Sequence, residues 1–166
     1  MTREANSTIE VKVWRLALDG RTDTPVVILQ ETAGKRVLPI WIGRSEARAI
    51  AMEMAGQKFQ RPLTHDLLKT VIEGLEGAVC RVAITELREN TFFAKLFIEK
   101  GDEIIGVDAR PSDSIALALK TKCPVFVAEE LLREPTTEEM SDDERAEALR
   151  RYLDEMNPED FGKFPL

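Results

Sequence analysis

The sequence predicts an α+β domain with a mixed, largely antiparallel sheet and helices packed on it. Three observations support this fold class. Strand-like segments with alternating apolar residues form two runs, residues 8–42 and 79–107, with hairpin turns between neighbouring segments. A segment with helical apolar spacing follows each run. Strict alternation of strand and helix is absent, which argues against a doubly wound nucleotide-binding fold.

The first run of strands begins at residues 8–18, where isoleucine and valine alternate with polar residues. A short strand over residues 26–29 and a returning strand over residues 37–42 follow, joined by a glycine-containing turn. Ser45 is then placed to cap a helix over residues 46–55.

A second helix is predicted after Thr64, which we expect to act as its N-cap. Apolar residues recur in it at helical spacing, so we expect one face of this helix to be buried. That face comprises Leu67, Leu68, Val71, Ile72 and Leu75.

The second run of strands covers residues 79–87, 92–98 and 103–107. Ser112 is expected to cap the helix that follows this run. A last short strand at residues 124–127 and a helical turn complete the body of the domain. Within the 166 residues we therefore expect a flexible N-terminus (1–7), an α+β domain (8–133) and a tail (134–166).

The net charge of −7 is concentrated in the tail. Residues 134–166 hold 11 of the 30 acids and 4 of the 23 bases, which leaves 19 of each in residues 1–133. A capping box at residues 141–144 predicts an acidic helix. Its narrow apolar stripe consists of Ala146, Leu149, Leu153 and Met156. We expect this tail to be helical or partly disordered, and three alternatives stay open for its helix: it packs on the body, it binds a protein partner, or it is unattached.

The composition excludes several classes of protein. There is no basic footprint of the kind that ordinary duplex-binding proteins carry. No apolar run approaches the roughly 20 residues that span a bilayer, and residues 1–7 lack a signal-peptide stretch, so we expect a cytoplasmic protein without a membrane partner. Cys80 and Cys123 form no zinc-binding pattern and are expected to be buried free thiols.

One polar pattern occurs twice, as RPLTHDL at residues 61–67 and DARPSDS at residues 108–114. Each copy has Arg-Pro, then a hydroxyl residue, then an acid in the first turn of a helix, and the first copy contains the only histidine. Free N–H groups at helix starts attract anions. If the fold brings both starts together, they form one polar pocket. The repetition also suggests an internal duplication.

These motifs, together with LPIWIG at residues 38–43 followed by Glu46 and Ala47, make the sequence resemble the bifunctional nuclease domain family. The resemblance covers roughly residues 8–132, with three motifs in the same order and spacing. It implies an α+β fold, a homodimer, and cleavage of both DNA and RNA. It carries over no agreed set of catalytic residues, so the site has to be argued from this chain's own side chains.

Phosphodiester hydrolysis needs an activated water, positive charge at the phosphate and a stabilised leaving oxygen. The candidate catalytic residues are His65, Asp66, Asp108 and Asp113. The candidate substrate-binding residues are Arg61, Arg110, Ser112 and Thr64. The candidate metal ligands are Glu46, Asp66, Asp108 and Asp113, whose oxygens favour Mg²⁺ or Mn²⁺. No organic cofactor is expected.

Each of these residues also has a structural interpretation. The two hydroxyl residues can serve as helix caps, and first-turn acids are stabilised by the helix dipole. Arg61 and Arg110 can pair with those acids instead of binding phosphate. Two functions therefore remain open: a metal-assisted nuclease that binds single-stranded or otherwise accessible RNA or DNA weakly, and a non-catalytic dimeric binding module.

Overall fold

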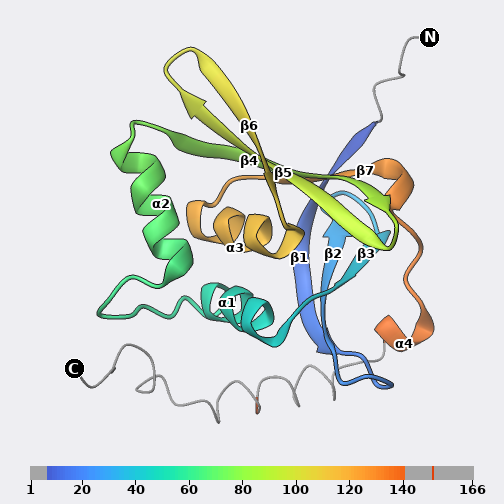
Figure 1. Cartoon of the computed structure of the whole chain (residues 1–166). Coiled ribbons are helices and arrows are strands. Elements are labelled where there is room, and N and C mark those ends of the chain that lie inside the picture. The colour runs from blue at the N-terminus through green and yellow to red at the C-terminus, as the bar shows by residue number, and fades with distance from the viewer. Residues whose placement is uncertain (1–6, 141–150, 152–166) are drawn as a thin grey trace.

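A computed structural model describes residues 7–140 and residue 151 of the chain (Figure 1). The domain contains, in chain order, β1 (Thr8–Leu18), β2 (Pro25–Glu31), β3 (Val37–Trp41), α1 (Arg44–Met54), α2 (Thr64–Gly74), β4 (Ala78–Arg88), β5 (Thr91–Lys100), β6 (Glu103–Ala109), α3 (Pro111–Thr121), β7 (Val125–Ala128), a 3-10 turn η1 (Glu129–Leu131) and α4 (Thr137–Met140). The predicted α+β class is confirmed, and the strands and helices predicted within residues 8–133 lie within a few residues of the observed ones.

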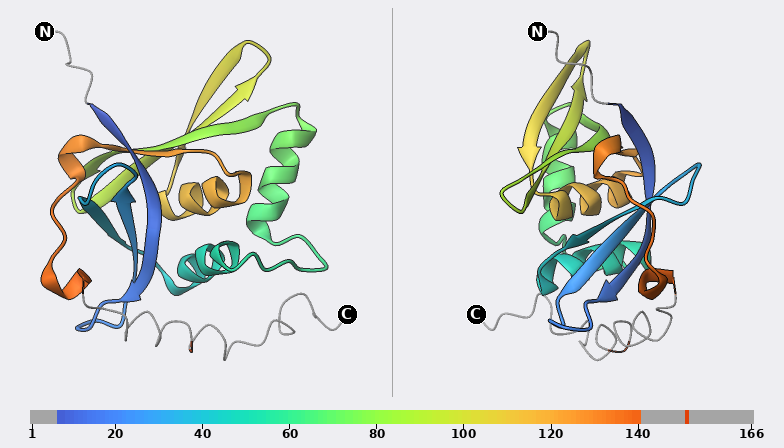
Figure 2. Two further views of the ribbon diagram at one scale, coloured as in Figure 1. Left: turned by 180° about the vertical axis from the view of Figure 1, so that it is seen from behind. Right: turned by 90° about the vertical axis from the view of Figure 1, so that its right-hand side faces the viewer.

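The strands of the described region form one seven-stranded sheet in the order β3-β2-β1-β7-β4-β5-β6. All neighbouring strands are antiparallel except β4 and β7, which are parallel. The sheet is strongly curved, and its strands β4 and β5 pack against α3 (Figure 2). A mixed, largely antiparallel sheet was the sequence-based expectation, and it is confirmed.

The helix α3 lies at the centre of the domain. Its side chains Ile115, Ala116, Leu117 and Ala118 are each at most 1% exposed, because α1 packs on one side and β4 and β5 cover another. A helix that is apolar nearly all round is stable only when it is buried in this way. Any charged side chain on α3 therefore has to find a partner or reach the surface.

The strand β3 shows how the sheet divides the apolar residues between its two faces. Leu38 and Ile40 belong to the main core beneath the helices. Val37 instead packs with Val26 and Ile28 in a smaller cluster. Side chains alternate between the faces of a strand, so this division follows directly from the period-two pattern in the sequence.

The helix α2 differs from the prediction of a buried apolar face. Within it only Ile72 is buried. The other four predicted core residues are 40–64% exposed: Leu67, Leu68, Val71 and Leu75. The prediction was wrong because periodicity shows that a helix has an apolar stripe, but not that the same chain covers it. α2 stands at the edge of the domain (Figures 1 and 2).

The two halves of the chain repeat the order of three strands followed by a helix, β1-β2-β3-α1 and β4-β5-β6-α3. The two Arg-Pro motifs are not at equivalent places in this repeat. The motif at residues 108–114 starts α3, whereas the motif at residues 61–67 starts α2, which has no counterpart in the other half. The repeated topology therefore does not explain the repeated motif.

Both cysteines are free, as expected, but they are half-buried instead of buried. Burial raises the pKa of the Cys123 thiol, which favours its neutral form. Apart from residue 151, the predicted acidic helix at residues 142–156 lies outside the described residues, as does most of the predicted N-terminal segment. Within the described part of the chain, no helix is long and apolar enough to cross a membrane.

Candidate functional site

The first turns of α2 and α3 meet, as the polar motifs suggested. His65 in the first turn of α2 and Asp113 in the first turn of α3 are joined by a contact of 3.0 Å between Nε2 and Oδ1. The imidazole side chain is 18% exposed and the carboxylate 29% exposed, so both are partly shielded from solvent. Two residues that lie far apart in the sequence thus form one polar site.

Arg110 completes this site from the residue that precedes α3. Its Nε donates to Asp113 Oδ2 at 2.8 Å and its Nη2 donates to Asp113 Oδ1 at 3.2 Å. Its Nη1 donates to Glu46 Oε1 in the first turn of α1 at 3.0 Å. We call His65, Asp113, Arg110 and Glu46 the His65 cluster.

Electrostatics within the His65 cluster favour the charged forms of its carboxylate and guanidinium. Burial raises the pKa of the Asp113 carboxyl, but hydrogen bonds from Arg110 and His65 outweigh this and hold the pKa below its usual value. The bonds to Asp113 raise the pKa of Arg110 in turn. Bidentate pairs between an arginine and a carboxylate fix the geometry of both groups as well as their charge. The carboxylate is therefore ionised and fixed in place beside the imidazole.

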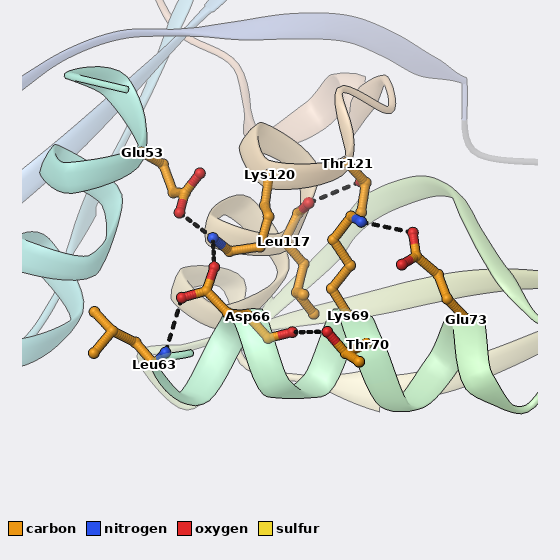
Figure 3. Close-up of polar contacts among 9 residues, drawn as sticks. All are labelled: Glu53, Leu63, Asp66, Lys69, Thr70, Glu73, Leu117, Lys120 and Thr121. Atoms are coloured by element: carbon orange, nitrogen blue, oxygen red, sulfur yellow. Dashed lines mark hydrogen bonds and ion pairs between the residues drawn. The ribbon is translucent and has the colours of Figure 1, made fainter. Parts of the chain in front are cut away.

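A second polar group lies two helical turns further along α3 (Figure 3). The Nζ of Lys120 contacts both Glu53, in the last turn of α1, and Asp66, in the first turn of α2. The Lys120 side chain is only 12% exposed. Burial lowers the pKa of Lys120, but its two acidic partners outweigh this and raise the pKa above the usual value. We call Lys120, Glu53 and Asp66 the Lys120 bridge.

The two groups form two levels of one junction between three helices. Glu46 and Glu53 are seven residues apart on α1, and Asp113 and Lys120 are seven apart on α3. Residues at this spacing lie on the same face of a helix. At each level α1 supplies an acid, the chain at α3 supplies the cation, and the first turn of α2 supplies His65 or Asp66. α1 and α3 therefore run in the same direction.

Local sequence explains how these helices begin, but with different caps from those expected. The N-caps are Leu63 and Arg110, both with extended backbone, and neither makes a side-chain cap bond. Thr64 and Ser112 lie inside the helices, so the expectation that they are N-caps was wrong. In α2 the Oδ2 of Asp66 instead accepts the N–H of Leu63 at 2.8 Å. An acid at the third helical position satisfies a free N–H as well as a hydroxyl does.

The N-cap of α1 is likewise Gly43 and not Ser45, which lies inside that helix. A Cβ at Gly43 would lie 2.1 Å from Oε2 of Glu46. Glycine at this position therefore lets the Glu46 carboxylate fold back against the start of α1.

Other candidate residues lie outside the His65 cluster. Asp108 is exposed on β6, opposite Lys95 of β5. Arg61 is exposed in the loop before α2. Thr64 and Ser112 are close in sequence to the cluster, yet no side-chain hydrogen bond joins either residue to it within residues 7–140. Asp66 points into the Lys120 bridge.

Of the four candidate metal ligands, only Glu46 and Asp113 lie together within the described residues, and both are bound by Arg110. Asp113 is occupied by Arg110 and His65, Asp66 is occupied by Lys120 and Leu63, and Asp108 faces solvent. Among residues 7–140 and residue 151, no three His, Cys, Asp or Glu side chains are arranged to hold a metal ion. The side chains of the described residues thus do not fit a Mg²⁺ or Mn²⁺ site, and no chemical step is assigned to a metal.

The sequence motifs missed Glu53 and Lys120. A signal for Lys120 was present, because it directly follows the apolar segment at residues 115–119. A lysine at the end of a helix that is buried nearly all round is rarely unpaired. No comparable signal marked Glu53, which is one of several charged residues on α1.

A cavity of about 380 Å³ lies elsewhere, between the outer face of β1–β3 and α4. Trp41 lines it, is 53% exposed, and donates from Nε1 to Oδ2 of Asp19 at 2.8 Å. None of the candidate catalytic, substrate-binding or metal-binding residues lines this cavity.

The His65 cluster has the groups that acid–base chemistry requires. Asp113 contacts one imidazole nitrogen and fixes the orientation of the ring, which leaves the other nitrogen to exchange a proton. Arg110 is 64% exposed and lies beside the imidazole, where its guanidinium can meet an anion. A site of this kind can move a proton next to a phosphate group.

Comparison with known proteins identifies the family. The family model of the bifunctional nuclease domain matches residues 27–140. An uncharacterized protein of Mycobacterium tuberculosis is 40% identical over 163 residues, which covers 92% of this chain and 97% of that protein. Proteins named bifunctional nuclease 1 from Arabidopsis thaliana and from Oryza sativa subsp. japonica are each 27% identical over 105 residues, or 61% of this chain. The match spans 32% of each of these plant proteins. The chain therefore belongs to the bifunctional nuclease domain family.

Proposed function

We propose that this protein is a nuclease that hydrolyses phosphodiester bonds in RNA, DNA or both at the His65 cluster. The observation that carries the proposal is the 3.0 Å contact between His65 Nε2 and Asp113 Oδ1 in a chain of this family. The plant relatives named as bifunctional nucleases support the same reaction class.

In this proposal His65 accepts a proton from the attacking water or donates one to the leaving oxygen. Asp113 contacts the ring nitrogen and orients the imidazole. Arg110 offers its exposed guanidinium to the phosphate. A positioned base of this kind contributes about 10²–10⁴-fold in rate. The neutral body implies weak binding and a preference for single-stranded or otherwise accessible nucleic acid.

The test compares the wild-type protein with His65→Ala and Asp113→Asn, prepared identically, on labelled single-stranded RNA, single-stranded DNA and duplex DNA. Each substrate is incubated with Mg²⁺, with Mn²⁺ and with a chelator, so that dependence on a metal is measured directly. We expect His65→Ala to lose about 10²–10⁴-fold in rate. The matched control is Lys69→Met, which removes a cation whose ion pair among the described residues is with Glu73 of the same helix, at 2.6 Å.

A contaminating nuclease is the main hazard in this assay, because it would give cleavage in every sample. The proposal is therefore tested by loss of cleavage in the variants and not by cleavage in the wild type. If folded His65→Ala and Asp113→Asn proteins cleave as fast as the parent, the His65 cluster is not the active site. Retention of cleavage in the chelator would show that the reaction proceeds without a divalent metal.

One observation favours the second function, a non-catalytic binding module. Arg110 is already bound by Asp113 and by Glu46, so its charge is largely balanced within the chain. Under this alternative the His65 cluster only joins the helices, and the wild-type protein cleaves none of the three substrates.

The remaining proposals concern partners and location. A homodimer is supported by α2 and its C-cap Leu75, because three apolar side chains of the helix and that of Leu75 are exposed among the described residues. The free thiols support a reducing compartment such as the cytoplasm. Recruitment of a protein partner by the acidic tail remains a prediction from the sequence.

A further inference from the structure

The helix that carries His65 is held weakly by apolar contacts. Only Ile72 of α2 is buried, and the remaining large apolar side chains of α2 face outward. Apolar burial is the usual force that holds a helix on a domain. The position of the first turn of α2 therefore depends strongly on its polar contacts.

The Lys120 bridge supplies the contacts that hold this turn. Asp66 uses Oδ1 to contact Lys120 and Oδ2 to accept the N–H of Leu63 (Figure 3). One carboxylate thus joins the N-cap of α2 to the last turn of α3. His65 directly precedes Asp66, so any displacement of Asp66 moves the imidazole as well.

Removal of the Lys120 charge would convert this attraction into repulsion. Glu53 and Asp66 both contact Nζ of Lys120 and come from different helices. Without the ammonium group two carboxylates would face each other in a site that is partly shielded from water. The first turn of α2 would then move away from α1, and His65 would leave Asp113.

We propose that Lys120 and Asp66 are positioning residues that hold His65 against Asp113, and that neither touches the reacting groups. The catalytic consequence rests on the proposed function, whereas the geometric statement does not. Asp66 thereby acts as a structural anchor for the imidazole instead of a metal ligand or catalytic acid.

The sole histidine makes the geometry directly measurable. His65 gives the only imidazole Hε1–Cε1 cross-peak in a ¹H–¹³C NMR spectrum of the full chain, so no assignment is needed. Wild type, Lys120→Met, Asp66→Asn and Lys120→Arg are compared at one pH, with Asp113→Asn as the reference for a lost carboxylate. Lys69→Met is the matched control, because it removes a lysine whose partner Glu73 is on the same helix.

We expect the His65 cross-peak in Lys120→Met and Asp66→Asn to move from the wild-type position towards that of Asp113→Asn. Lys69→Met should keep the wild-type position, and Lys120→Arg should restore most of it because the charge remains. Asn at position 66 can still accept the N–H of Leu63, so this variant decides the question if Lys120→Met does not fold. Wild-type cross-peaks in the folded positioning variants would overturn the proposal.

Cleavage provides the second readout. A displacement of about 1 Å in a catalytic group can cost up to about 10²-fold in rate, so kcat should fall in Lys120→Met with little change in KM. The kcat of Lys69→Met should stay within about twofold of the wild-type kcat. If the wild-type protein does not cleave, the proposed function fails while the NMR comparison still decides the positioning role. If Lys120→Met and Asp66→Asn keep full kcat while His65→Ala is inactive, the positioning role fails and the proposed function stands.

Discussion

Replacement of Lys120 by Met should destabilise the fold in a way that depends on pH. The lysine side chain is 12% exposed, and its partners Glu53 and Asp66 are 21% and 33% exposed. Breaking a fully buried pair costs about 3–5 kcal/mol, whereas a surface pair contributes about 0–1 kcal/mol. The partial exposure places the expected loss between these limits, at about 1–3 kcal/mol near pH 7.

The loss should shrink as the pH falls. Burial raises the pKa of the Asp66 carboxyl. The contact with Lys120 and the N–H of Leu63 lower this pKa by more, so the net pKa is below its usual value of 3.8. In the wild type this depressed pKa contributes stability above about pH 4, and that contribution is lost as the pH falls through the folded-state pKa. Lys120→Met removes the main contact that lowers the pKa of Asp66, while the burial that raises this pKa remains. Protonation of Asp66 at mildly acidic pH then relieves the repulsion between the two carboxylates.

Urea unfolding of both proteins at pH 7 and pH 4.5, followed by circular dichroism, measures the two free energies. With an m value of about 2 kcal/mol/M, the midpoint at pH 7 should fall by about 0.5–1.5 M. Lys69→Met serves as the control and should change the free energy of unfolding by less than about 0.5 kcal/mol. This account of the Lys120 bridge would be refuted if Lys120→Met had the wild-type free energy of unfolding at pH 7. It would also be refuted if the difference between the two proteins grew towards pH 4.5.

Three further predictions concern the core, a helix end and the outer face of α2. Ile115→Ala should lower the free energy of unfolding by about 2–5 kcal/mol, since Ile115 is 0% exposed at the centre of the core; urea unfolding measures this, and a loss below 1 kcal/mol would contradict it. Lys122→Gly should raise the stability by about 1 kcal/mol, because Lys122 ends α3 with φ of 58°, where a β-carbon is strained; an unchanged unfolding midpoint would argue against strain there. Leu67→Asp should shift a homodimer towards monomer in light scattering, because Leu67 is 55% exposed on the apolar stripe of α2; a wild-type protein that is monomeric at all concentrations would end the dimer proposal.

Much of the fold follows from local patterns in the sequence. The strand β1 was predicted with its observed bounds, because alternating apolar residues match the two faces of a strand. The hairpin between β4 and β5 was also predicted, and Glu89 and Asn90 in its turn have φ of 49° and 59°. Residues that accept this backbone conformation mark such turns in a sequence.

The errors share one physical cause. The caps at Thr64 and Ser112 were assigned from residue preference, but Pro111 begins α3 and the Asp66 side chain accepts a backbone N–H at the start of α2. The apolar stripe of α2 was assigned to the core, although most of its side chains are exposed and no other part of the described chain packs over them. In both cases a local preference was consistent with more than one tertiary arrangement.

The sequence by itself determined which segments become strands and helices, that two polar motifs start helices, and that the only histidine lies in one of them. Only the tertiary structure decided that His65 meets Asp113, 48 residues away, and that Asp66 meets Lys120, 54 residues away. Periodicity is a property of each element alone, because side-chain direction repeats along its own axis. The pairing of charges between elements depends on how the helices pack on the curved sheet, and no local pattern encodes that geometry.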